Sequence, residues 1–108
     1  MKLKEAMLAD QYLPTRLKFI SDPGHGWLRV PHKVIEQVGL SKKDFSGSSY
    51  VDDDYMYLEE DMDAGVFIET FKRLNGVEPN YEMEHVGETD RVYRVRTKLR
   101  NLNGKDQF

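Results

Sequence analysis

The sequence predicts a single α+β domain over residues 1–108, with an antiparallel sheet of about six short strands and two helices on one face (ββα-ββα-ββ). Short runs that alternate apolar and polar residues recur between turn-forming residues, which is typical of strands. Two other segments carry apolar residues at helical spacing. The connections between successive strands are short, and short connections favour antiparallel pairing.

The first unit is predicted as a hairpin followed by a short helix. Residues 1–14 are expected to form an N-terminal arm or short helix that ends at a proline. Strands are expected over residues 16–21 and 27–30, joined by the turn DPGHG, because Pro fixes φ and two glycines permit positive φ. Pro31 is expected to open the helix, since proline is favoured in the first turn, and Gly39 to end it.

The second unit repeats this order. Strands are expected at residues 49–51 and 55–58, with the aspartates of residues 52–54 at the hairpin tip, because adjacent carboxylates repel one another in a strand. Asp61 is the predicted N-cap of the main helix, and Asn75-Gly76 is the predicted stop. The apolar stripe of this helix is made by Ala64, Phe67, Ile68, Phe71 and Leu74.

A last hairpin is expected from strands over residues 81–86 and 91–97, with a turn between them, before a flexible tail at residues 101–108. Arg94, Arg96 and Arg100 share one face of the final strand with Lys98. A row of basic side chains on one face of a strand can bind nucleic-acid phosphates. It can equally protect an edge strand from aggregation or pair with Glu82 and Glu84 across the hairpin.

Composition excludes several classes of protein. There is no cysteine, so disulfides, thiolate zinc sites and cysteine nucleophiles are excluded. No apolar run approaches the roughly 20 residues that a membrane span needs, so no membrane partner is expected. Residues 51–70 hold eight acidic side chains and no basic one. This predicts either a surface with separate acidic and basic regions or a fold in which the acidic segment pairs with the basic ends of the chain.

The turn DPGHGW is the first candidate site. His25 stands between two glycines, where it is expected to be exposed, mobile and able to act as a general base or a ligand contact. Trp27 follows as a stacking surface, and Asp22 precedes both. The alternative interpretation is structural: the glycines serve the turn, Asp22 bonds its backbone, and Trp27 belongs to the core.

The acidic corner after residue 58 is the second candidate site. Glu59, Glu60 and Asp61 follow Tyr57, and together they mark either a recognition site or the caps and dipole partners of a helix start. If the two hairpins are neighbours, His25 approaches Glu59 and Glu60, which is a pattern for acid–base chemistry. No cofactor motif and no metal-binding pattern is present, so we expect neither a cofactor nor a metal.

DPGHGWLRVP (residues 22–31) and YLEEDMDAGVF (residues 57–67) resemble motifs of small uncharacterised proteins encoded by bacteriophages and other mobile elements. The resemblance covers roughly residues 17–95 and carries no activity. It implies a virus-encoded accessory protein made in the cytoplasm of a bacterial host.

Three functions are therefore open. The first is a protein without catalytic activity that binds a host protein, another host macromolecule or a regulatory ligand, in host takeover or counter-defence. The second is a small hydrolase or ligand-binding enzyme that uses His25 with Glu59 or Glu60. The third is a nucleic-acid binder that uses the basic final strand. The sequence leaves the oligomeric state open.

Overall fold

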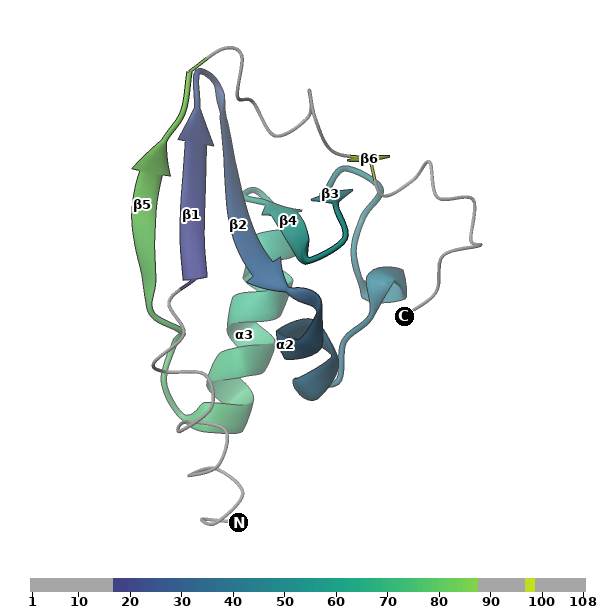
Figure 1. Ribbon diagram of the computed structural model, residues 1–108. Helices are drawn as coiled ribbons and strands as arrows, with labels where there is room; N and C mark the ends of the chain where they lie inside the picture. Colours follow the sequence, from purple (N-terminus) through teal and green to yellow (C-terminus); the bar gives the residue numbers. More distant parts are fainter. Residues whose placement is uncertain (1–16, 88–96, 99–108) are drawn as a thin grey trace.

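A computed structural model describes residues 17–87 and 97–98 (Figure 1). The predicted N-terminal arm, most of the predicted strand 91–97 and the predicted tail lie outside the described residues, as do Arg94, Arg96 and Arg100.

The described residues form one sheet and two α-helices, which confirms the α+β class. The strands lie in the order β5-β1-β2-β4-β3-β6 across the sheet. Residues 42–44 add one turn of 3-10 helix. The elements in chain order are β1 (Leu17–Asp22), β2 (His25–Pro31), α2 (His32–Gln37), β3 (Tyr50–Val51), β4 (Tyr55–Glu59), α3 (Asp63–Asn75), β5 (Tyr81–His85) and β6 (Thr97–Lys98).

The sheet is mixed, so the prediction of a purely antiparallel sheet was wrong. The pairs β1–β2, β2–β4, β3–β4 and β3–β6 are antiparallel, but β5 runs parallel to β1. The cause is α3, whose 13 residues carry the chain back along the sheet before β5 begins. Because β4 already runs parallel to β1, a strand that follows such a crossover runs the same way as both.

Of the second strand of the predicted final hairpin only Thr97 is described, and it pairs with Val51 of β3 rather than with β5. β5 and β6 lie at opposite edges of the sheet (Figure 1). β5 pairs with β1 instead, and Lys18 Nζ lies 3.1 Å from Glu84 Oε1. The basic partner of Glu84 therefore comes from the first strand of the chain.

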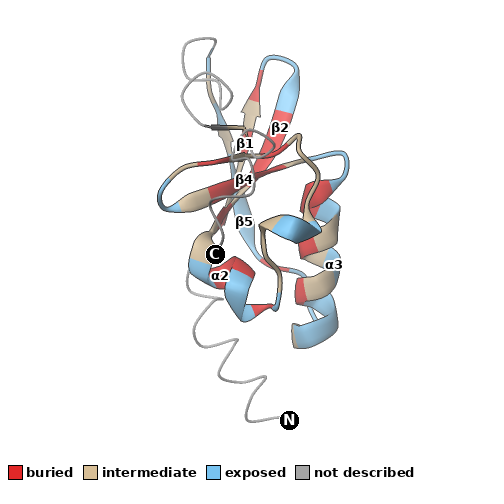
Figure 2. Ribbon diagram, turned by 90° about the vertical axis from the view of Figure 1, so that its right-hand side faces the viewer, coloured by how far each residue is buried: buried red, intermediate tan, exposed pale blue. Residues whose placement is uncertain are grey.

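The main core lies between the two helices and one face of the sheet (Figure 2). Alternation places Leu28 and Val30 of β2 on this face, and Val34 and Phe67 come from the two helices. Leu74, predicted in the apolar stripe of α3, lies in the last turn of the helix and is 39% exposed. The other buried members of this core are Leu17, Ile35, Val38, Val51, Met56, Leu58, Ala64 and Phe71.

A second, aromatic cluster occupies the opposite face of the sheet. Ile20, Trp27 and Tyr57 are buried there, with Tyr50 and Tyr55 partly buried against them. The helices cover the other face, so this cluster consists of the strands' own large side chains. The candidate site is built at one end of this aromatic face.

Candidate functional site

The pairing of β2 with β4 brings the two predicted corners together. Trp27 is the register partner of Glu59, and the Glu60 N–H donates to the Gly26 carbonyl at 3.1 Å. β2 begins where β4 ends because the two strands are antiparallel. The His-Gly-Trp segment therefore lies directly beside the acidic junction that leads into α3.

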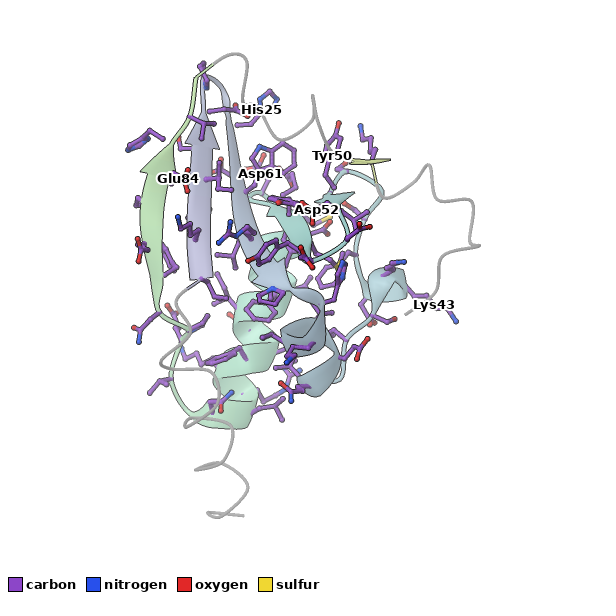
Figure 3. The ribbon with its side chains drawn as sticks, viewed as in Figure 1. His25, Lys43, Tyr50, Asp52, Asp61 and Glu84 are labelled. Atoms are coloured by element: carbon purple, nitrogen blue, oxygen red, sulfur yellow. The ribbon has the colours of Figure 1, made fainter. Side chains whose placement is uncertain are left out.

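An open pocket of about 380 Å³ lies at this junction. Figure 3 labels three of the residues that line it, His25, Tyr50 and Asp61. The side chains come from both corners, from the loop that precedes β3, from β3 itself and from β6. The full lining is His25, Trp27, Ser46, Ser48, Tyr50, Glu59, Asp61, Met62 and Lys98.

His25 contacts two neighbouring side chains, Asp22 and Trp27. The turn contains only Pro23 and Gly24, and Gly24 takes a φ of 111°, so His25 is already the first residue of β2. Its Nδ1 lies 3.1 Å from Oδ1 of Asp22, and its ring stacks on Trp27 with centroids 5.8 Å apart. The imidazole keeps one flank in solvent, with 46% of the side chain exposed.

The side chain of Asp22 contacts both His25 and Trp27. Its carboxylate is fully buried, and its second oxygen accepts a hydrogen bond from the Trp27 indole N–H at 3.3 Å. One carboxylate therefore contacts both rings: the indole N–H donates to one oxygen, and His25 Nδ1 lies within hydrogen-bond distance of the other. Trp27 is itself only 3% exposed, which supports its interpretation as a core residue that also forms the pocket floor.

The acidic residues of the second corner have different roles. The Glu59 carboxylate accepts hydrogen bonds from the N–H groups of Asp61 and Met62, at 3.0 and 3.1 Å. The prediction that Asp61 caps α3 was wrong, because the N-cap position is Met62 and no side chain caps it. Glu59 accepts from both backbone donors, and the exposed Asp61 carboxylate makes no hydrogen bond or ion pair with any of residues 17–87 and 97–98.

Glu60 and Tyr57 lie outside the pocket. Glu60 follows the end of β4, and its carboxylate lies over Gly26, where any Cβ would collide with it. Tyr57 is buried, and its hydroxyl donates to Asp52 Oδ2 at 2.6 Å. Of the predicted site residues, His25, Trp27, Glu59 and Asp61 are thus brought to one pocket, and Asp22 supports two of them.

Asp63, the fourth carboxylate of the acidic corner, is a structural residue. It is 1% exposed, and its carboxylate accepts bonds from the Ser46 N–H, the Ser46 hydroxyl and the Ser49 hydroxyl. The Ser49 hydroxyl oxygen in turn accepts the Glu59 N–H at 3.0 Å. These bonds fasten the loop that supplies Ser46 and Ser48 to the start of α3.

Sequence reasoning missed Ser46, Ser48, Tyr50 and Met62 as pocket residues. Lys98 was recognised only as part of a basic strand. Its Nζ lies 5.8 Å from the centroid of the Tyr50 ring, within the range of a cation–π contact. No local signal marks these residues, because their role arises from the pairing of β3 with β6 and from the path of the loop.

The pocket combines an aromatic floor with charges of both signs on its rim. Trp27 and Tyr50 meet edge to face with centroids 5.2 Å apart, and Met62 is 62% exposed beside them. The rim carries the carboxylates of Asp61 and Glu59, the amino group of Lys98 and the imidazole of His25. Such a lining can hold a ligand group that has an apolar stem and a polar tip.

Within the described ranges, no group of three or more histidine and acidic side chains is arranged to hold a metal ion. None of the helices found there is long and apolar enough to cross a membrane. Comparisons with protein families, with curated proteins and with solved structures found no significant match.

Proposed function

We propose that this chain is a small binding protein, without catalytic activity, that meets its partner at the pocket between the β1–β2 turn and the β4–α3 junction. The observation that carries this proposal is the convergence of His25, Trp27, Glu59 and Asp61 on one open pocket. Asp61 and Met62 project there without being needed for the fold: one carboxylate lacks a bonded partner among the described residues, and one thioether is mostly exposed.

The partner that this chemistry fits is a protein that presents a lysine or arginine side chain. The aliphatic stem would lie against Met62 and Tyr50, and the cationic head would reach Asp61. Through the resemblance to bacteriophage-encoded proteins, we assign the partner to the bacterial host, in host takeover or counter-defence within the host cytoplasm.

Asp61→Lys is expected to lower the affinity for the partner at least about tenfold, because it replaces an attraction with a repulsion at a contact made only in the complex. The matched control is Glu69→Lys, which makes the same charge change at an exposed position of α3 away from the pocket. The partner would be captured from host lysate with the wild-type chain. The affinity of each variant would then follow from the fluorescence of Trp27, the only tryptophan.

Equal loss of affinity in both variants would show a general charge effect, and the pocket would then not be the binding site. Capture of no partner by the wild-type chain would count against binding as the function. Thermal melting of Asp61→Lys is the check on folding, since a lysine before a helix costs only about 0.3–1 kcal/mol through the helix dipole.

A small hydrolase is the second candidate, and one observation favours it. A buried carboxylate holds the Nδ1 side of His25 while the ring lines a pocket that also contains Glu59, an arrangement that orients an imidazole as a general base. Glu60 is not part of this candidate, because it lies outside the pocket.

If His25 is such a base, His25→Gln is expected to lower turnover of an activated ester or phosphodiester by about 10²–10⁴-fold. Turnover by the wild-type chain no faster than in buffer would eliminate the hydrolase. Glu69→Gln is the control for a contaminating activity, because its exposed carboxylate lies far along α3 from the pocket.

A further inference from the structure

Beyond the pocket, we propose that the outer edge of β5 is a second interaction surface, which adds an extended strand from a partner protein. The partner strand has basic residues on one face and apolar residues on the other. β5 is the last strand at its side of the sheet, and in the described part of the chain it pairs only with β1 (Figure 1). An edge of this kind is a template for strand addition.

The hydrogen-bond register shows which backbone groups of β5 are available. Leu17 N–H donates to the Asn80 carbonyl at one end of the β1–β5 pair, and Val86 N–H donates to the Ser21 carbonyl at the other. In a parallel pair, alternate residues of a strand bond to the same neighbour. The even-numbered residues of β5 therefore bond to β1, and the N–H and C=O groups of Tyr81, Met83 and His85 point outward.

The acidic and the apolar side chains of β5 lie on opposite faces of the sheet. Glu82 and Glu84 lie on the face that carries Lys18, whereas Tyr81 and Met83 lie on the face of the helices. Tyr81 is 47% and Met83 54% exposed. Four of the five exposed large hydrophobic side chains in the described chain fall between residues 74 and 83, so the apolar surface is concentrated along the end of α3 and β5.

Charge complementarity identifies the partner. Lys18 bonds to Glu84, but Glu82 has no cationic partner among the described residues, and a basic side chain on an added strand would lie next to both carboxylates. Antiparallel pairing of two copies through β5 about Met83 would place Glu82 opposite Glu84 of the other copy, and like charges in direct opposition destabilise a sheet. The surface therefore fits a different, basic and apolar strand.

The probe is a fluorescein-labelled hexapeptide of alternating lysine and valine, titrated by fluorescence anisotropy. Met83→Pro removes an outward N–H while leaving the bonds to β1 intact, and proline is tolerated where an edge strand's N–H faces solvent. We expect Met83→Pro to weaken peptide binding at least about tenfold. Met83→Ala, which keeps the N–H, should weaken it less. Amide exchange at residues 81, 83 and 85 should slow on peptide addition.

Asp61→Lys is expected to leave peptide affinity unchanged, so this surface and the pocket can fail independently. Three outcomes would overturn the proposal: no binding of the peptide, equal binding of a glutamate–valine peptide, or binding that Met83→Pro does not affect. Sedimentation that shows a dimer sensitive to Met83→Pro would also overturn it, because a second copy would then occupy the edge.

Discussion

Asp63→Ala is expected to lower the free energy of unfolding by about 3–5 kcal/mol. The wild-type carboxylate is buried and accepts bonds from the Ser46 N–H at 2.9 Å, the Ser46 hydroxyl at 2.8 Å and the Ser49 hydroxyl. Alanine leaves the buried Ser49 hydroxyl and the partly buried Ser46 donors without their acceptor, and it removes a carboxylate from the first turn of α3. Urea denaturation followed by far-UV circular dichroism measures the loss.

Asp61→Ala is the matched control for Asp63→Ala. It lies two residues away on the exposed side of the same junction and should change stability by no more than about 0.5 kcal/mol. Asp63→Asn should fall between the two, because an amide oxygen accepts fewer charge-assisted bonds. If Asp63→Ala unfolds within about 1 kcal/mol of the wild type, the loop is held by other contacts and Asp63 is not its anchor.

The loop that Asp63 holds also lines the pocket. Ser46 and Ser48 both face it, and Ser49 connects the same carboxylate to the backbone of Glu59. A loosened loop must be ordered again when a ligand binds, and that ordering lowers affinity. Under the proposed function, Asp63→Asn should therefore weaken partner binding even at temperatures where the chain stays folded.

Local signals in the sequence were sufficient for the elements and their ends. The stop at Asn75-Gly76 is confirmed, because Gly76 takes a left-handed φ of 81° and its N–H donates to the Lys72 carbonyl. The hairpin tip of three aspartates is confirmed as well, with Asp52 Oδ1 accepting the N–H groups of Asp54 and Tyr55. Each of these features is decided within a few residues of chain, so sequence spacing determines it.

The choice of sheet edge could not be predicted in this way. β5 pairs with β1, which lies more than 60 residues earlier in the chain. The residues around β5 in the sequence contain no pattern that indicates this pairing. The Lys18–Glu84 contact supplies a long-range reason, but the sequence offers arginines nearer to Glu84 as equally good partners. Pairing rules based on short connections therefore did not predict that β5 lies beside β1.

The candidate site was predictable in part for a related reason. Its corners follow from the turn residues and the acidic run, but which carboxylate enters the pocket depends on strand alternation up to the last residue of β4. Glu59 shares the face of Trp27, its register partner, whereas Glu60 turns toward Gly26. A boundary error of one residue exchanges these two glutamates.

Trp27 is the second residue at which a large effect is expected. Trp27→Ala should lower the free energy of unfolding by about 3–5 kcal/mol, since the ring is buried against Tyr57 and Tyr50 and supports the His25 imidazole. Trp27→Phe keeps most of the ring and should lower it by about 1–3 kcal/mol, chiefly by removing the N–H that the buried Asp22 accepts. Circular dichroism is the measurement, because both variants lose the only tryptophan.

The contribution of the indole hydrogen bond can be separated from ring packing by a double-mutant cycle. The cycle combines Trp27→Phe, which removes the indole N–H, with Asp22→Ala, which removes both acceptor oxygens. If the 3.3 Å contact stabilises the corner, the two losses are not additive, and the coupling energy is about 0.5–3 kcal/mol. Additive losses would show that packing alone holds Trp27, and that Asp22 acts on the pocket only through His25.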